Sequence, residues 1–148
     1  MAAKLHHTGL TVSDLDRALR FWCDALGGQE VFRQERSGGY FEAIVCEPGA
    51  RVRMAQLELE PGGHRVELFH FDAPQAGGHR LRPADVGFAH VCVATDEIDA
   101  LLGRLETAGG TRMTDPVEID AGVNAGGRAV YVRDPDGHVL ELFQPPAG

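Results

Sequence analysis

The chain has 148 residues, which is enough for one ordinary domain or two very small packed units and too few for separate cofactor and substrate domains. Hydrophobic residues make up 43% of the sequence and charged residues 24%, a balance that supports a packed core and excludes disordered and fibrous proteins. Lys and Arg number 14 against 22 Asp and Glu, so the net charge of -8 repels nucleic acid phosphates and anionic lipids. We therefore expect neither nucleic acid nor a membrane as a partner.

The cysteines indicate a reducing compartment. Cys23, Cys46 and Cys92 lie far apart and form no CxxC pair, which argues against a disulfide framework and a Cys-rich zinc site. The first residues show no apolar secretion signal, and no stretch approaches the roughly 20 apolar residues that a membrane span needs. We expect a cytoplasmic protein.

The first half of the chain predicts a strand, a helix and then several strands. The opening strand covers residues 5–12, and a helix follows Ser13, whose hydroxyl can cap the first turn, and ends at Gly27 and Gly28. The apolar residues of this helix recur at helical spacing: Leu15, Ala18, Leu19, Trp22, Ala25 and Leu26. Strand-like segments follow at 29–36, 40–47, 52–60 and 65–71, with a turn at 60–63.

The second half repeats this plan after a linker-like segment, residues 73–86, that is rich in Pro, Gly and charge. A strand at 88–94 precedes a helix that Thr95 can cap and that Gly109 and Gly110 end. Strands are expected at 111–114, 128–133 and 139–143, with a turn at 134–137. A small sheet with one covering helix leaves its other face apolar, so we expect the two units to pack together and to share a concave site.

Each half places a histidine in its first strand and a glutamate in its last strand. These residues are His7 and Glu67 in the first half and His90 and Glu141 in the second. A carboxylate in a strand as apolar as Leu-Glu-Leu-Phe is costly to bury unless a positive partner meets it. Two imidazoles and two carboxylates suit Zn, Ni, Co, Mn or Fe(II). The sequence therefore predicts one divalent metal ion held by these four residues.

Each of the four residues also has an ordinary structural interpretation when taken alone. A strand histidine is more often a core or surface residue than a ligand, and a strand glutamate often faces solvent. Surface residues have no reason to recur at matching places in both halves, so the duplication favours metal binding. His6 is an alternative to His7, but strand alternation and the match with His90 favour His7.

Further side chains are candidates for lining a cavity, although ordinary packing or exposure also explains each of them. These are Tyr40, Arg53, Gln56, Phe69, Asn124, Arg128 and Tyr131. The glycine-rich loop at 120–127 is either a lid or an exposed turn. Cys92 should face the same side as His90, as a packing or supporting thiol.

These patterns resemble the vicinal oxygen chelate superfamily, which includes glyoxalases, bleomycin resistance proteins and extradiol dioxygenases. The resemblance is carried by residues 7–15, by 88–91 with 96–99, and by 131–137 leading into Leu140-Glu141-Leu142. It covers nearly the whole chain and implies a single α+β domain, with βαβββ modules at 4–72 and 87–145 joined by a linker at 73–86. In such a fold the curved mixed sheets enclose a metal at His7, Glu67, His90 and Glu141. Members either place both modules of one chain in one site or swap modules between chains, and dimers are common, so we expect a homodimer.

The resemblance implies an enzyme acting on a small oxygenated substrate, in which the metal stabilises charge on a carbonyl or enolate oxygen. We expect a glyoxalase-like lyase, isomerase or epimerase in which Glu141 or Glu67 carries the proton, with a slight preference for Glu141. One alternative is an Fe(II) or Mn(II) extradiol-type dioxygenase. Another is a bleomycin-resistance-like antibiotic-binding protein without catalysis, for which Trp22, Phe41 and Phe69 would matter.

The chain departs from particular members of that superfamily. Glyoxalase I usually carries Arg two positions after the glycine that is Gly9 here, and this chain has Thr11 there, which argues against glutathione recognition. Methylmalonyl-CoA epimerase usually has Gln at the place of Glu67, and extradiol dioxygenases have no ligand there. The four-residue set in turn argues against a pure binding module.

Overall fold

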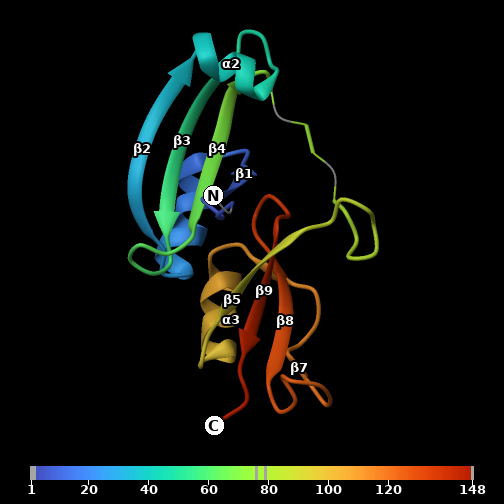
Figure 1. Cartoon of the computed structure of the whole chain (residues 1–148). Helices are drawn as coiled ribbons and strands as arrows, with labels where there is room; N and C mark the ends of the chain where they lie inside the picture. The colour runs from blue at the N-terminus through green and yellow to red at the C-terminus, as the bar shows by residue number, and fades with distance from the viewer. Residues whose placement is uncertain (1–2, 76, 79, 148) are drawn as a thin grey trace. The chain divides into compact units, whose positions relative to one another are not determined.

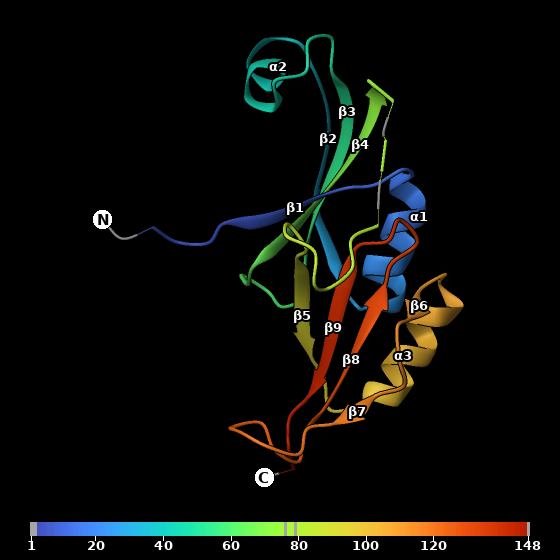
Figure 2. The ribbon, with the colours of Figure 1, turned by 90° about the vertical axis from the view of Figure 1, so that its right-hand side faces the viewer.

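The computed structural model describes residues 3–75, 77–78 and 80–147, and the chain divides into two compact units, Met1–Gly78 and His79–Gly148. We call them module one and module two. The predicted modules at 4–72 and 87–145 each fall within one of these units. Each module is a mixed sheet with helical segments packed against it (Figures 1 and 2), so the predicted α+β class is confirmed.

Module one contains a four-stranded sheet in the order β1-β4-β3-β2. Its elements in chain order are β1 (His7–Thr11), α1 (Leu15–Leu19), a wider π-helical continuation η1 (Arg20–Ala25), β2 (Gln29–Ser37), α2 (Gly39–Val45), β3 (Arg51–Glu58) and β4 (Arg65–Ala73). β1 runs parallel to β4, whereas β4, β3 and β2 are antiparallel neighbours. The first strand therefore lies directly beside the last strand.

Module two repeats this topology in a five-stranded sheet in which β5-β9-β8-β6 are neighbours and β7 also pairs with β8. Its elements are β5 (His90–Ala94), α3 (Ile98–Thr107), β6 (Thr111–Arg112), β7 (Val117–Glu118), β8 (Arg128–Arg133) and β9 (Val139–Gln144). β5 runs parallel to β9, as β1 does to β4. The expected strand at 111–114 is shorter than predicted, and β7 was not anticipated.

The two sheets also share their register around the glutamates. In module one, Glu67 pairs with Gly9 on β1 and with Gln56 on β3. In module two, the equivalent glutamate, Glu141, pairs with Cys92 on β5 and with Tyr131 on β8. The two halves predicted as a repeat from the sequence therefore also share the strand pairing around Glu67 and Glu141.

The helices cover one face of each sheet and leave the glutamates on the other. The helical segment of module one packs on β3 and β4, and its Trp22 is fully buried. Val66 and Leu68 on β4 are buried as well, and they alternate with Glu67. Because successive side chains of a strand point to opposite faces, Glu67 faces away from this helix. Complete burial of each such apolar side chain contributes roughly 1.5–3 kcal/mol to folding. This free energy determines which face of the sheet packs against the helix.

Residues 40–47 were predicted as a strand, and this prediction is wrong: Gly39–Val45 forms α2, at the edge of the sheet where β2 and β4 end and β3 begins (Figure 1). Gly38 and Gly39 have φ values of 67° and 58°, which favour glycine and break the strand before the helix. Phe41 is buried and packs with Ala50 and Val52. Burial of this one ring on the end of the sheet outweighs the strand preference of the aromatic and β-branched residues around it.

The helix starts differ by one or two residues from those predicted. Asp14, not Ser13, is the N-cap of α1, because its Oδ1 accepts the Arg17 backbone N–H at 2.8 Å. The Ser13 hydroxyl accepts instead from the Arg17 guanidinium. Thr95 accepts the backbone N–H of Glu97, which is the residue at the N-cap of α3, so its hydroxyl orders the turn before the helix and does not cap it.

The predicted helix ends and hairpin turns are confirmed. α3 closes with paired bonds from Gly109 N–H to Glu106 O and from Gly110 N–H to Leu105 O, a Schellman motif. The turns at 60–63 and 134–137 are each closed by an N–H to C=O bond of 3.0 Å between their first and last residues. In the loop at 120–127, residues 120–126 are exposed and Gly127 is buried; Gly126 N–H bonds Ile119 O and Gly127 N–H bonds Asn124 O. Within the described residues, no helix has the length and apolar character to cross a bilayer.

Candidate metal centre

In module one, the parallel pairing of β1 with β4 brings His7 and Glu67 together. His7 Nε2 lies 3.2 Å from Glu67 Oε2, and the two side chains are 38% and 6% exposed. Glu67 is one of the few charged residues of the described chain that is buried. A buried carboxylate requires a charged or hydrogen-bonding partner on each oxygen, and His7 meets one of them.

His6 does not enter this pair but contacts the other side of the His7 ring. The two Nδ1 atoms are 2.8 Å apart, a hydrogen-bond distance. A hydrogen bond at Nδ1 determines which tautomer the imidazole adopts and so which nitrogen has a free lone pair. The choice of His7 over His6 in the sequence agrees with this geometry, and His6 becomes a partner of the His7 ring.

The second oxygen of Glu67 is held by a chain of polar side chains within the same sheet. Gln56 Nε2 donates to Glu67 Oε1 at 2.7 Å, and Arg65 Nη1 donates to Gln56 Oε1 at 3.2 Å. Arg65 Nε also donates to Glu58 Oε1 at 2.8 Å, and Glu58 Oε2 accepts the Gly62 N–H. Glu67 is therefore held on both oxygens, by His7 and by Gln56.

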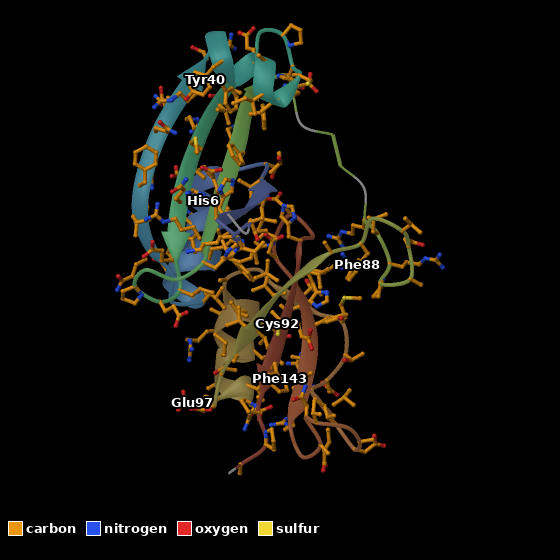
Figure 3. The ribbon with its side chains drawn as sticks, in the orientation of Figure 1. His6, Tyr40, Phe88, Cys92, Glu97 and Phe143 are labelled. Carbon is orange, nitrogen blue, oxygen red and sulfur yellow. The ribbon has the colours of Figure 1, made fainter. Side chains whose placement is uncertain are left out.

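In module two, the equivalent pair is His90 and Glu141. His90 Nε2 lies 3.0 Å from Glu141 Oε2, and these side chains are 34% and 26% exposed. Cys92, labelled on β5 in Figure 3, lies beside Glu141, as its predicted direction requires. Burial, followed by the nearby Glu141 carboxylate, raises the pKa of the Cys92 thiol. The Cys92 side chain therefore meets Glu141 as a neutral thiol.

Aromatic rings surround His90 on the side of β8. The Tyr131 ring lies 5.1 Å from the His90 ring, centroid to centroid, and Phe88 lies 6.2 Å from each of them. Burial, and then the Glu141 carboxylate, raises the pKa of the Tyr131 phenol, so it is a neutral hydrogen-bonding group at neutral pH. Tyr131 is thus placed to hold the imidazole ring and to offer a hydroxyl beside Glu141.

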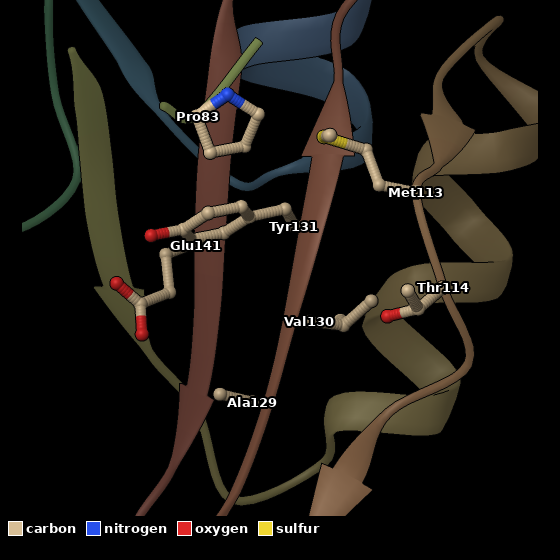
Figure 4. Close-up of a pocket in the computed structure, with 7 residues that line it drawn as sticks. All are labelled: Pro83, Met113, Thr114, Ala129, Val130, Tyr131 and Glu141. Carbon is tan, nitrogen blue, oxygen red and sulfur yellow. The ribbon is translucent and has the colours of Figure 1, made fainter. Parts of the chain in front are cut away.

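Glu141 also forms part of the wall of a hollow of about 370 Å³ within module two (Figure 4). Its lining is mostly apolar, with Pro83, Met113, Thr114, Ala129, Val130 and Tyr131 completing the wall. Figure 4 shows the Tyr131 ring extending from β8 across the face of β9. Glu141 is therefore open to a small molecule, whereas Glu67 is buried.

The geometry of each pair fits two adjacent ligands of a divalent ion. Two adjacent ligands on an octahedral ion, with bonds of about 2.1 Å, are separated by about 3.0 Å, close to the 3.2 Å and 3.0 Å found here. Within the described part of the chain, no group of three or more His, Cys, Asp and Glu side chains is gathered closely enough to hold a metal. The structure thus shows two separate His–Glu pairs, and their union in one four-ligand site is a proposal.

The other candidate residues are dispersed: Phe69 packs against the Phe41 cluster of module one, and the exposed Asn124 lies in the loop at 120–127. Gln56 and Tyr131 lie beside the glutamates, as described above. Arg53 and Arg128 instead form ion pairs with Asp72 and Asp99, and the largely exposed Tyr40 accepts a hydrogen bond from Arg36. Arg65 and Phe88 were not predicted as site residues, because their contacts depend on strand register and long-range packing that no local pattern reveals.

Two mixed sheets of the same topology, each with a His–Glu pair on its adjacent parallel strands, define a duplicated α+β protein with two matching half-sites. The chain belongs to the Glyoxalase/Bleomycin resistance protein/Dioxygenase superfamily, whose family model matches residues 4–142. The resemblance found in the sequence is thereby confirmed.

Among curated relatives, a 2-epi-5-epi-valiolone epimerase from Actinomyces sp. is 33% identical over 99% of this chain and 82% of its own length. A probable lactoylglutathione lyase from Synechocystis sp. is 26% identical over 95% of this chain and 94% of its own length. Among solved structures, a glyoxalase family protein from Bacillus cereus superposes with a TM-score of 0.86 at 22% identity, covering 99% and 97% of the two chains. That structural similarity shows the fold, and the curated relatives support an enzyme of the isomerase, epimerase or lyase class.

Proposed function

We propose that this protein is a divalent-metal-dependent epimerase that moves a proton at the carbon beside a carbonyl group of a small oxygenated substrate. The observation that supports it most is the recurrence of one His–Glu pair, at 3.2 Å and 3.0 Å, in the same register of both modules. The epimerase relative, which matches 99% of the chain, favours this reaction among those of the superfamily. Its named substrate, 2-epi-5-epi-valiolone, is the first compound to test.

The proposed site has His7, Glu67, His90 and Glu141 as ligands of a single ion, with the two half-sites taken from one chain or from two chains of a dimer. When bound, such an ion supplies Lewis-acid polarisation of a carbonyl oxygen. The mixed N/O donor set suits Zn, Ni, Co, Mn or Fe(II). We further propose that the protein is cytoplasmic and forms a homodimer. Light scattering on the purified protein tests the dimer by its molar mass.

In this proposal the two glutamates have different roles. Glu67 is 6% exposed, accepts a hydrogen bond from Gln56 at one oxygen and contacts His7 at the other, so it stays in place. Glu141 is 26% exposed and lines a hollow of about 370 Å³, so its carboxylate reaches a bound substrate. Glu141 accepts the proton from the carbon next to the carbonyl, and a proton delivered by solvent water to the opposite face inverts that carbon. The Glu141 carboxyl then releases its proton to solvent. The neutral Tyr131 hydroxyl offers a hydrogen bond to a substrate oxygen in the same hollow.

The test follows 2-epi-5-epi-valiolone by NMR in D₂O with protein loaded in turn with each metal. We expect solvent deuterium to enter at the carbon beside the carbonyl while the epimer appears. Glu141→Gln should slow this exchange about 100- to 10,000-fold, the usual contribution of a general base. Glu118→Gln, at an exposed carboxylate on β7 of the same module, is the matched control and should keep full activity.

Three results would contradict the proposal. Absence of bound metal by elemental analysis and on titration would remove the metal site. Full exchange by Glu141→Gln would remove Glu141 as the proton carrier. Oxygen uptake with a catechol panel, without epimerisation, would favour the dioxygenase alternative, which rests only on the superfamily match.

A lyase acting on the adduct of glutathione with methylglyoxal is a second candidate, because probable lactoylglutathione lyases match 95% of this chain. Thr11 stands at the position where the resemblance to glyoxalase I calls for Arg, which argues against binding of glutathione. The standard absorbance assay for S-lactoylglutathione distinguishes the two activities. Turnover of that adduct with no effect on 2-epi-5-epi-valiolone would reverse their order.

A further inference from the structure

We propose that Gln56 and Arg65 are positioning residues that fix Glu67 as a static metal ligand and make module one the anchoring half of the site. The inference rests on the proposed metal site and goes beyond it. It assigns metal anchoring to the His7–Glu67 pair, whereas Glu141 of the other pair transfers the proton. Three hydrogen bonds carry it, all within the β3–β4 pair of module one and its hairpin turn.

The direction of the Gln56 amide is determined by its partners. A guanidinium can only donate hydrogen bonds and a carboxylate can only accept them. Arg65 Nη1 lies 3.2 Å from one end of the amide, so that end is the oxygen. The amide nitrogen then faces Glu67 Oε1 at 2.7 Å. Rotation of the amide by 180° would place two donors together at one end and two acceptors at the other, so Arg65 holds Gln56 in the donating orientation.

The arrangement delivers a neutral donor to Glu67. Arg65 is paired with Glu58 at 2.8 Å, and Glu58 is further held by the Gly62 N–H. The Arg65 guanidinium is thus paired with the Glu58 carboxylate and does not itself contact Glu67. A cation in direct contact with the carboxylate would compete with a metal ion for it, whereas an amide N–H orients one oxygen and leaves the other, Oε2, facing His7.

Module two lacks this arrangement because the equivalent positions differ. Tyr131 pairs with Glu141 in the register that Gln56 holds with Glu67. Val139 pairs with His90 in the register that Arg65 holds with His7. Valine has no hydrogen-bonding side chain, so nothing at this position can hold Tyr131 as Arg65 holds Gln56. The asymmetry matches the exposures of 6% for Glu67 and 26% for Glu141.

The test measures the dissociation constant for Zn²⁺ by competition with a chromogenic chelator, on the full chain and without substrate. We expect Gln56→Leu and Arg65→Met each to weaken Zn²⁺ binding about 10- to 100-fold, as loss of a ligand's hydrogen-bond partner does. Because Arg65 acts through Gln56, the double variant should bind no more weakly than Gln56→Leu alone.

Matched controls separate this role from general damage to the sheet. Gln34→Leu removes an amide on β2 that contacts Met54, and Arg53→Met removes a guanidinium on β3 that pairs with Asp72. Both controls should bind Zn²⁺ as tightly as the unaltered protein. Should Gln56→Leu fail to fold, Arg65→Met gives the same readout, because Arg65 is partly exposed and leaves the amide in place.

The outcomes distinguish the two proposals. If the unaltered protein binds none of Zn²⁺, Ni²⁺, Co²⁺, Mn²⁺ and Fe²⁺, the metal site itself is wrong and this inference falls with it. If it binds another of these ions but not Zn²⁺, the same competition is measured with that ion. If the unaltered protein binds Zn²⁺ and the Gln56 and Arg65 variants bind it within threefold, the inference alone is wrong. A full additive loss in the double variant would also overturn it, because the two residues would then act independently.

Discussion

The ring of Tyr131 lies against the ring of His90, with centroids 5.1 Å apart and planes at 42°. Such aromatic pairs contribute roughly 0.5–1.5 kcal/mol beyond the area they bury. The position is equivalent to that of Gln56 in module one, yet the contact is made to the histidine of the pair and not through an amide to the glutamate. His90 is thus held by packing.

Replacement of Tyr131 tests this packing. Tyr131→Leu should lower the free energy of unfolding by about 1 kcal/mol, because the aromatic contacts with His90 and Phe88 are lost. Tyr131→Phe keeps the ring and should lose less than half of that amount. Urea denaturation followed by circular dichroism measures both values. Equal losses in the two variants would show that the hydroxyl, not the ring, stabilises the module.

Substitution of the two adjacent histidines should give unequal effects on metal binding. His7→Ala removes the imidazole that faces Glu67 and should abolish stoichiometric binding. His6→Ala removes only the hydrogen bond at His7 Nδ1 and should weaken the affinity 10- to 100-fold. Zn²⁺ titration of both variants checks the order. Stronger loss in His6→Ala would mean that the two residues exchange roles when the metal binds.

Cys23 gives a prediction for alkaline pH. Burial, and then the neighbouring carboxylates of Glu30 and Asp24, raises the pKa of this thiol from 9.0 to about 11. The neutral thiol is therefore favoured in the folded state, so its contribution to stability is complete below pH 9 and is lost as the pH rises toward 11. Relative to Cys23→Ala, the unaltered protein should lose stability across this window.

Alkylation by iodoacetamide checks the same pKa directly. In a Cys46→Ser, Cys92→Ser background, the rate at Cys23 should rise with a midpoint near 11. The matching stability measurement is urea denaturation at pH 8, 9 and 10. A midpoint near 9, with no change in relative stability, would contradict the burial of this thiol.

Two glycine-to-alanine substitutions should change stability in opposite directions. A Cβ at Gly28 would lie 2.6 Å from the Trp22 carbonyl oxygen and 2.8 Å from Leu57 Cδ1, so Gly28→Ala should destabilise by about 1–3 kcal/mol. Gly103 lies within α3, and apart from its chain neighbours and the adjacent backbone of the helix no atom lies within 4 Å of such a Cβ, so Gly103→Ala should stabilise by about 0.5–1 kcal/mol. Thermal melts of the two variants measure the signs. A stable Gly28→Ala variant would show that the end of η1 can shift.

Much of the fold could be predicted from the sequence because the two halves repeat. Apolar spacing identified the helical stretches that became α1 with η1 and α3, and paired glycines marked both of their ends. The helix at 39–45 was missed because its residues favour strands locally, and the decisive contact of Phe41 with Ala50 and Val52 forms only in the folded sheet. The α1 cap was misplaced because Ser13 and Asp14 are both good capping residues, and only geometry separates them.

The candidate site shows the same division. Each His–Glu pair was predictable, because duplicated motifs align across the two halves. Gln56 and Tyr131 were named only as candidates among several, since their position beside the glutamates depends on the antiparallel register. Arg65 was not named as a candidate, because its hydrogen bonds to Glu58 and Gln56 depend on the strand pairing that brings these acceptors beside it.

The hairpin turns ahead of β4 and β9 have a consequence for the site that no ligand contact reveals. A slip of one residue in a strand turns every side chain to the opposite face. The turns at 60–63 and 134–137 set the registers of Glu67 and Glu141, and in module two the buried Asp134 ties its turn by accepting the N–H groups of Asp136 and His138. Deletion of a single residue from either turn would therefore turn one glutamate toward the helix. The strand would still form, but its His–Glu pair would be lost.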